Sequence, residues 1–453
     1  MLRLQTMIDQ LNGLIWGPPL LILLIVVGIY LSFKTRGVQF RYLLYAHKLA
    51  FTPSQNEGAP GDITHFQALM TALAATIGIG SITGVATAIA IGGLGSLFWM
   101  WVAAVIGMAT KYGEAILAIK YRIMDEKGEM CGGPMYYLRK GLNSRVLAAS
   151  FAIFGAITAL GTGNLVQSNS VAAALDNLVG LPPWISGLML MVVVGVALIG
   201  GIKSIGRVAS VLVPLMAIFY IGGGLIIIAL RLDQIPQAFV LIFEQAFMGK
   251  APFGGFAGAS VMLAIQMGIS RGVFSSEAGL GSSPIAAAAA RTDTPGRQAL
   301  VSMCSVFITT GIVCTITGLV IAVSGVLGQV DANGVLLNGS SLALHAFDAV
   351  IPWGGVIVTI ALIPFAYSTI LGWAYYGEKC IEYLVGIRWV KPYRLLATLV
   401  VFPGAMLSLE LAWGFSNMMN GLMAFPNLIG LFLLAGVIGH ETHVFDRIVQ
   451  SES

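Results

Sequence analysis

Apolar runs long enough to cross a lipid bilayer follow one another along nearly the whole chain. A membrane-spanning helix needs about 20 mostly apolar residues. Only 10% of the 453 residues are charged, whereas soluble domains contain about 25%. The runs are continuous and do not alternate between apolar and polar residues, which excludes a transmembrane β-barrel. The sequence therefore predicts an all-α polytopic membrane protein with one transmembrane domain over residues 1–453.

Eleven transmembrane helices are expected, the first being a peripheral helix at residues 14–33. The other ten are expected near residues 64–92, 96–120, 147–176, 184–201, 207–230, 256–273, 299–327, 353–377, 395–411 and 416–438. The apolar segment 277–291 is too short to cross a bilayer. It predicts a re-entrant or interfacial hairpin, and Pro284 is suited to the start of its second arm.

Lysine and arginine are divided unevenly between the two sides of this arrangement. Cytoplasmic loops collect both residue types. With the N-terminus outside, 21 of the 24 basic residues fall on the inner side, and only Arg3, Arg231 and Lys250 fall on the outer side. One span more or fewer would destroy this asymmetry. We therefore expect a multi-pass protein of the plasma membrane, the bacterial cytoplasmic membrane, with its N-terminus outside and its C-terminus inside.

The stretch 71–93 contains several glycines in the middle of an otherwise apolar run. Gly78 and Gly80 lie beside the hydroxyl residues Thr76 and Ser81, and each glycine costs a helix interior about 1 kcal/mol relative to alanine. The pattern predicts that the helix opens within the membrane, where non-helical backbone is tolerated if it lines a polar cavity. The start of the second half-helix would then attract a carboxylate. The alternative is close packing of an intact helix through small residues.

A second glycine-rich span, at residues 256–273, carries Gln266 and Ser270. If the first helix is peripheral, residues 64–230 and 256–438 form two groups of five helices. Because five is odd, the second group must be inverted relative to the first. Broken helices at the start of each inverted repeat indicate a binding site in the middle of the membrane.

Two further spans carry polar residues in apolar surroundings. Asn164 and Gln167 lie three residues apart and therefore share a helix face. They face either a cavity or a neighbouring helix to which they donate hydrogen bonds. Ser368 and Thr369 offer two adjacent hydroxyls, which suit a hard cation such as sodium. Their alternative role is to bond the backbone of their own helix.

Charged pairs are expected at the cytoplasmic ends of spans, as interfacial ion pairs or gates. The pairs are Lys111 with Glu114, Arg271 with Glu277, and Glu378 with Lys379. None of them is placed as a proton carrier in the middle of the membrane, which favours a metal cation as the coupling ion. The four cysteines show no metal-ligand or disulfide spacing, and no cofactor is expected.

Several motifs together resemble the alanine/glycine:cation symporter family, also called the sodium:alanine symporters. They are HFQALMTALAATIGIGSITGVATAIA, FWMWVAAVIGMATKYGEAILAIKYR, GGPMYYLRKGL, GNLVQSNSVA, RGVFSSEAGLGSSPIAAAAARTDTPGRQALVSM and TILGWAYYGEKCIEYL. The resemblance implies a leucine-transporter-like core of five plus five helices after one extra helix. It also implies sodium-coupled or proton-coupled uptake of a small neutral amino acid, such as L-alanine, glycine or D-alanine.

The resemblance also assigns roles to particular residues. The substrate would bind at Thr76, Gly78, Ile79, Gly80, Ser81, Asn164, Gln167, Gln266, Phe274 and Trp373. Sodium would bind at Thr71, Ala75, Ser81, Ser368 and Thr369.

Two positions depart from the family pattern. Ser81 stands where the family usually has asparagine, and Gln266 stands where it usually has a large apolar residue. The first departure bears on which coupling ion is accepted, and the second on which amino acid is preferred.

Two other functions are weighed against symport. A channel would more often carry rings of like charge or repeated filter motifs. An intramembrane enzyme would need a nucleophile, a base or a metal-ligand set within a span. The sequence shows neither pattern, and the expected partners are a small neutral amino acid, Na⁺ and the lipid bilayer, without nucleic acid.

Overall fold

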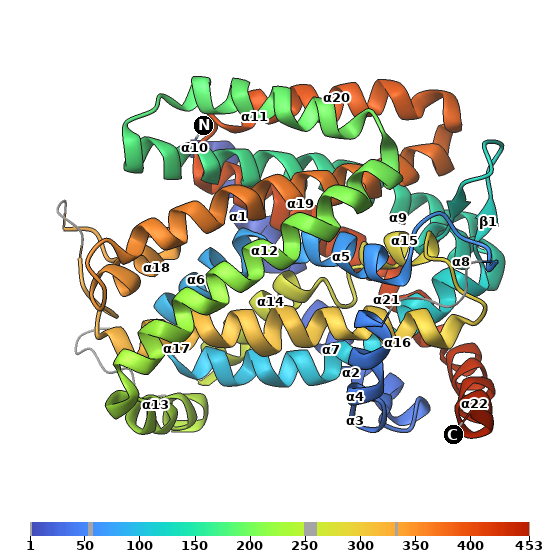
Figure 1. Cartoon of the computed structure of the whole chain (residues 1–453), viewed down its shortest axis with the longest axis horizontal. Coiled ribbons are helices and arrows are strands. Elements are labelled where there is room, and N and C mark those ends of the chain that lie inside the picture. The colour runs from blue at the N-terminus through green and yellow to red at the C-terminus, as the bar shows by residue number, and fades with distance from the viewer. Residues whose placement is uncertain (1, 53–57, 249–260, 331–333, 453) are drawn as a thin grey trace.

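The computed structural model describes residues 2–52, 58–248, 261–330 and 334–452, and they are predominantly helical (Figure 1). The first half contains α1 (Leu2–Ile15), α2 (Pro18–Lys34), α3 (Val38–Arg41), α4 (Leu43–Phe51), α5 (His65–Thr76), η1 (Ile79–Ser81), α6 (Thr83–Gly92), α7 (Gly95–Lys120), β1 (Ile123–Met124), β2 (Met130–Cys131), α8 (Pro134–Gly141), α9 (Arg145–Thr158), η2 (Ala159–Leu165), α10 (Val166–Val179), α11 (Pro183–Leu198), α12 (Gly201–Leu230), η3 (Leu232–Gln234) and α13 (Ile235–Met248). The second half contains α14 (Val261–Ser276), α15 (Ser283–Ala288), α16 (Pro295–Val306), η4 (Phe307–Cys314), α17 (Thr315–Ser324), α18 (Gly339–Asp348), α19 (Gly354–Val385), η5 (Ile387–Trp389), α20 (Val390–Gly404), α21 (Leu409–Leu433) and α22 (Ala435–Glu452). The two strands form a short antiparallel hairpin.

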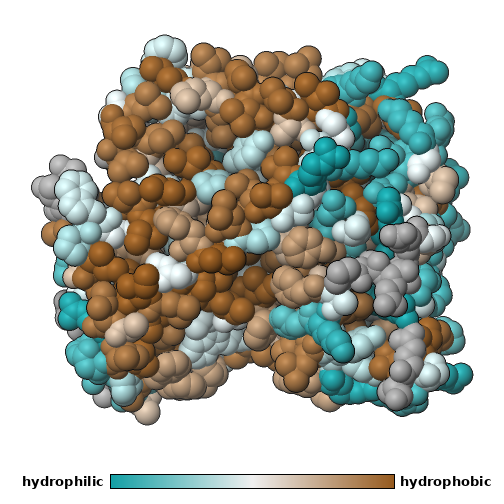
Figure 2. Space-filling view, viewed as in Figure 1, coloured by the Kyte–Doolittle hydropathy of each residue, from teal (hydrophilic) through white to brown (hydrophobic). Residues whose placement is uncertain are grey.

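A broad apolar surface covers the face of the molecule shown in Figure 2. In Figure 2 hydrophobic side chains face outward over most of the view, and hydrophilic residues gather at the edge where β1, α8 and α22 lie in Figure 1. Among the described residues, six helices are long and apolar enough to cross a membrane, and two bent helix pairs raise the number to eight. The class of multi-pass membrane protein is therefore confirmed, while the number eleven stays a prediction.

The N-terminal region differs from the single predicted span at residues 14–33. The chain forms two helices there, because Gly17 and the prolines at the start of α2 interrupt the first. Helix α1 packs on α21: the Asn12 Nδ2 donates to the Gly414 carbonyl oxygen at 2.8 Å, and the Trp16 indole donates to the Asn417 carbonyl oxygen at 2.7 Å. The sequence analysis did not predict α1, nor this contact between the two ends of the chain.

The predicted helix break lies between α5 and α6, whose axes differ by 65°. Helix α5 begins with a capping box, in which Thr64 and Gln67 each accept a hydrogen bond from the other's backbone N–H. It ends at Thr76, and the extended backbone of Gly78 precedes a short 3₁₀ turn. A Cβ atom at Gly78 would lie 2.5 Å from Thr369 Oγ1. Glycine is therefore required here by the close approach of α19.

A second break follows α14, later in the chain than the predicted position at residues 256–273. Helix α14 ends at Ser276, and Glu277, Gly279 and Gly281 all have positive φ angles before α15 begins. The segment 277–291 is thus the unwound continuation of this helix and not a separate hairpin, although Pro284 does lie in the first turn of α15. Residues 256–260 of the predicted span lie outside the described residues. The two broken helices lie side by side, since α6 packs on α14 and α5 packs on α15.

Candidate functional site

A small buried cavity lies where the two helix breaks meet α10, α19 and α21. It is lined by Ala75, Thr76, Gly78, Gly80, Thr162, Gln167, Phe274, Glu277, Leu280, Thr369, Trp373 and Asn420. The centres of water-sized spheres fill only about 10 Å³ of it, which is room for about one water molecule. Eight of the residues assigned to substrate or sodium by sequence meet here, namely Ala75, Thr76, Gly78, Gly80, Gln167, Phe274, Thr369 and Trp373.

Two backbone donors are left without an acceptor at the first break. The N–H groups of Ile79 and Gly80 have no hydrogen-bond acceptor among the described residues. They belong to the first turn of the second half-helix, where the helix dipole also favours negative charge. This end of the site is therefore suited to bind a carboxylate.

Two side-chain amides supply acceptors. The Nε2 of Gln167 donates to the Thr162 carbonyl oxygen at 3.1 Å, and the Nδ2 of Asn420 donates to Thr162 Oγ1 at 2.8 Å. Both amide nitrogens are thereby used, and the buried oxygens Gln167 Oε1 and Asn420 Oδ1 have no donor. Buried acceptors without a donor are costly, so these two oxygens are suited to receive hydrogen bonds from a ligand's ammonium group.

Sequence analysis missed Thr162 and Asn420. Thr162 lies in the π-helical segment η2, which joins α9 to α10, and local π-helix is often found at functional sites. Asn420 is an amide within an apolar span, and that property was a usable signal because such residues are rare when they face lipid.

Glu277 also lines the cavity, which contradicts its predicted pairing with Arg271 at a cytoplasmic helix end. Its backbone has φ +56°, which is uncommon outside glycine. Its side chain is buried, and Oε2 accepts a hydrogen bond from Ser282 Oγ at 2.6 Å. The site therefore contains a carboxylate beside the two free amide oxygens.

Lys111 and Glu114 on α7 hold the two ends of the second break. Both side chains are buried, so they do not form the predicted interfacial pair. The Lys111 Nζ donates to the Ser276 carbonyl oxygen at 2.8 Å, at the C-terminus of α14. Glu114 Oε1 accepts from the backbone N–H groups of Gly279 and Gly281 at 3.1 and 3.0 Å. A cation at the helix C-terminus and an anion before the next helix match the helix dipoles, and they fix the loop that carries Glu277.

Oxygen atoms from α5 and α19 converge beside the cavity. The hydroxyl of Thr369 donates to the Ala74 carbonyl oxygen at 2.9 Å, and that of Ser368 lies 3.4 Å from the same oxygen. Oxygen ligands are the type that hard cations prefer. The structure thus brings Ser368 and Thr369 to the broken helix, and the carbonyl they reach belongs to Ala74, next to the predicted Ala75.

Six of the residues assigned by sequence do not line this cavity, namely Ser368, whose hydroxyl lies beside it, and five others. The Thr71 hydroxyl bonds the Gln67 carbonyl of its own helix, and Ser81 Oγ pairs with Ser275 Oγ at 2.8 Å. Ile79 is buried and does not line the cavity. Asn164 Nδ2 donates to the Ala397 carbonyl on α20, so it has the predicted alternative role between helices. Gln266 lines a different cavity, on the other side of Phe274.

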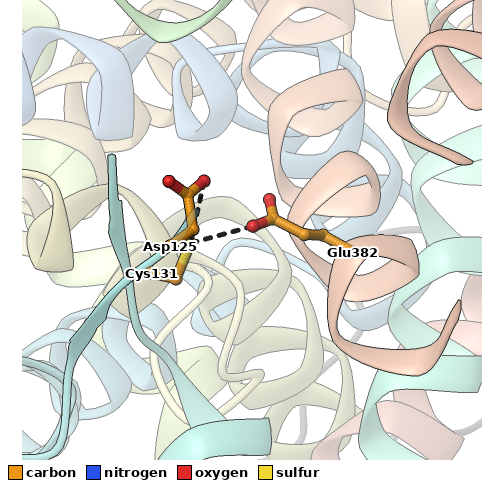
Figure 3. A group of neighbouring side chains, drawn as sticks. All are labelled: Asp125, Cys131 and Glu382. Atoms are coloured by element: carbon orange, nitrogen blue, oxygen red, sulfur yellow. Dashed lines mark hydrogen bonds between the residues drawn. The ribbon is translucent and has the colours of Figure 1, made fainter. Parts of the chain in front are cut away.

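A second cluster of polar groups lies at the β1–β2 hairpin, away from this site. Asp125, Cys131 and Glu382 point toward one another (Figure 3), with ligand atoms close enough for one metal ion. However, the Lys379 ammonium lies 2.9 Å from Glu382 Oε2, 3.3 Å from Cys131 Sγ and 3.7 Å from Asp125 Oδ2. The Lys379 ammonium group therefore already provides these three side chains with a positive charge.

Protonation in this cluster agrees with an ion-pair role. Burial raises the pKa of the Cys131 thiol to about 12, so it is neutral and donates to Glu382. Burial alone would raise the pKa of Asp125, but hydrogen bonds from the Glu129 and Lys127 N–H groups and the charge of Lys379 lower it below its usual value. The predicted pair of Glu378 with Lys379 is not formed, because Glu378 binds Arg394 with both carboxylate oxygens.

Paired helix breaks around a cavity with donors for an anion and acceptors for a cation are typical of secondary transporters. Comparison with known proteins defines the group more closely. The chain belongs to the sodium:alanine symporter family, whose model matches residues 1–453. This confirms the resemblance inferred from the motifs.

Individual relatives agree with the family. The chain is 52% identical to the sodium/alanine symporter AgcS of Methanococcus maripaludis, over 99% of this chain and 98% of that protein. It is 35% identical to the probable sodium/glutamine symporter GlnT of Bacillus subtilis, over 96% and 89% of the two chains. The family and these relatives are transporters and not enzymes.

Solved structures show the same fold at low sequence identity. MhsT in complex with L-phenylalanine has a TM-score of 0.56 at 12% identity, over 85% of this chain and 99% of that one. A Na⁺-coupled sialic acid symporter has a TM-score of 0.53 at 14% identity, over 89% and 86%. The leucine-transporter-like fold is thereby confirmed, whereas the exact repeat boundaries stay predictions.

Proposed function

We propose that the chain carries a small neutral amino acid into the cytoplasm by symport with Na⁺. The proposed substrates are glycine, L-alanine and D-alanine. The observation that carries this proposal is the pairing of opposite recognition groups in one cavity. Unbonded N–H groups of Ile79 and Gly80 lie at the first break, and the cavity is lined by the free amide oxygens of Gln167 and Asn420 and by the Glu277 carboxylate. An amino acid zwitterion satisfies both sets at once.

The size of the cavity favours a small side chain. Trp373 and Phe274 both line it, and a Cβ atom at Gly163 would lie 2.4 Å from the Trp373 Cβ, so the tryptophan is held tightly from behind. The transported amino acid would fit between these two aromatic rings. Alanine and glycine need the least displacement of either ring.

The coupling ion is assigned to the oxygens of Ala74, Ser368 and Thr369. These atoms come from a broken helix and from α19, so the ion would join two parts of the protein that move relative to each other during alternating access. Ion binding would thereby favour one arrangement of these helices, which is how a ligand with differential affinity shifts a conformational equilibrium.

Uptake of radiolabelled alanine into proteoliposomes tests the proposal. With an inward Na⁺ gradient, we expect saturable accumulation above the outside concentration, and none when the gradient is collapsed. A pH gradient replaces the Na⁺ gradient in a parallel assay, which decides between Na⁺ and H⁺. Linear, gradient-independent entry would instead indicate a channel and would contradict symport.

A further inference from the structure

A second, larger cavity lies directly behind Phe274. It is formed by the end of α1, by α14 and by α21, and the centres of water-sized spheres fill about 190 Å³ of it. Phe274 lines this cavity and the small central one, so its ring is the partition between them. Gln266, which sequence analysis assigned to the central site, lines this outer cavity instead.

Arg271 brings a positive charge to this cavity, and no described carboxylate forms an ion pair with it. The residue lies in the middle part of α14 and lines the cavity wall. Its guanidinium lies 5.4 Å from the centre of the Trp413 ring and 6.0 Å from that of Phe274. It has no hydrogen bond or ion pair with any described residue. A guanidinium has five N–H donors in a planar fork that matches a carboxylate, and charged groups inside membrane proteins are costly unless paired.

Asn12 brings an acceptor without a donor to the same cavity. Its Nδ2 is used on the Gly414 carbonyl, and its Oδ1 is buried and has no hydrogen-bond partner. Asn12 lines the cavity together with Arg271. The cavity therefore repeats the chemistry of the central site, with a donor group for an anion and a free amide oxygen for an ammonium.

We propose that this outer cavity is a second binding site for the transported amino acid. Arg271 binds the carboxylate through its guanidinium, and Asn12 Oδ1 accepts a hydrogen bond from the ammonium group. Movement of the Phe274 ring then connects this site to the central cavity. The carboxylate site stands on the geometry alone, and only the identity of its ligand as the transported amino acid rests on the proposed function.

Propanoate tests the carboxylate site, because it has the carboxylate of alanine and lacks the ammonium group. The probe is the tryptophan fluorescence of the purified full-length chain in lipid nanodiscs, since Trp413 lies against the Arg271 guanidinium. We expect a saturable change with propanoate that is lost in Trp413→Phe and in Arg271→Gln, and retained in Arg271→Lys. No saturable change in the unmodified chain, or an equal change in Trp413→Phe, overturns the site.

Alanine uptake tests whether the site serves transport. In Arg271→Gln the alanine concentration for half-maximal uptake should rise about 10- to 100-fold, the usual effect of losing a hydrogen bond to a charged group. The maximal rate and the Na⁺ requirement should not change. Propanoate should inhibit alanine uptake by the unmodified chain and should not inhibit uptake by Arg271→Gln. Arg271→Lys should recover part of the affinity. A uniform fall in rate with unchanged alanine affinity would show that Arg271 only packs against Trp413, and it overturns the proposal.

The two assays separate this inference from the proposed function. If propanoate binds at Arg271 but the unmodified chain shows no Na⁺-dependent alanine uptake, the proposed function fails and the carboxylate site stands. If uptake is Na⁺-dependent and propanoate neither changes the Trp413 signal nor inhibits, the proposed function stands and this inference fails.

Discussion

Thr369 Oγ1 on α19 lies 2.9 Å from the carbonyl oxygen of Ala74 on α5. The contact joins residues 295 positions apart. Ala74 lies two residues before the end of α5, where the helix breaks. A carbonyl near the C-terminal end of a helix carries partial negative charge, so a cation between it and the hydroxyl would be favoured. This one contact connects the helix break, the central cavity and the proposed sodium site.

Ser368→Ala and Thr369→Ala should each raise the Na⁺ concentration for half-maximal alanine uptake more than they raise the alanine concentration. Each change removes one oxygen from the proposed ion shell, at about 1 to 3 kcal/mol, or about 5- to 150-fold. Thr359→Ala is the matched control, because Thr359 lies on the same helix and bonds the Gly355 carbonyl of that helix. A shift in the alanine requirement alone would assign the pair to the substrate or to packing.

Gln167→Ala should weaken alanine binding by about 1 to 3 kcal/mol, because it removes a buried acceptor that has no hydrogen-bond donor within the protein and is proposed to bind the substrate ammonium group. Ser170→Ala is a suitable control, since Ser170 lies on the same helix and bonds the Val166 carbonyl of that helix. The apparent affinity for alanine is measured at saturating Na⁺ in proteoliposomes containing equal amounts of protein. An unchanged affinity would remove Gln167 from the substrate site.

Glu277→Gln should abolish high-affinity alanine uptake while Na⁺ binding in the absence of alanine persists. The substitution keeps the size of the side chain and removes the charge that would face the ammonium group, a loss of about 2 to 5 kcal/mol for a buried charge pair. Binding of radioactive Na⁺ and of alanine to purified protein separates the two effects. Asp293→Asn, at a partly exposed carboxylate paired with Arg297, should change neither. Loss of Na⁺ binding in Glu277→Gln would instead make Glu277 an ion ligand.

The orientation of the chain is tested with cysteines introduced at exposed positions. The four native cysteines are all buried, so an impermeant thiol reagent would miss them from either side. In a cysteine-free chain, Lys127→Cys in the β1–β2 hairpin should stay unlabelled in intact cells, and Asp233→Cys before α13 should be labelled. The opposite pattern would invert the predicted topology.

Local sequence determined the class of protein, the first helix break and much of the central site. Long apolar runs can only be buried in lipid or protein, and the glycines at 78 and 80 weaken the helix that contains them, so both features are readable without tertiary contacts. The family motifs likewise identified Gln167, Phe274, Thr369 and Trp373, which the fold brings to one cavity.

Only the tertiary structure decided which helix each polar face meets. Asn164 and Gln167 share a helix face in the sequence pattern, yet one bonds α20 and the other lines the cavity, because Asn164 lies in the π-helical segment η2 and Gln167 lies in the α-helix that follows it. Glu277 and Arg271 lie within two turns of each other, but α14 ends between them. The unwound backbone sends Glu277 to the central cavity and leaves Arg271 behind Phe274. Periodicity fixes directions only within a continuous helix, and the packing of distant helices decides what lies in each direction.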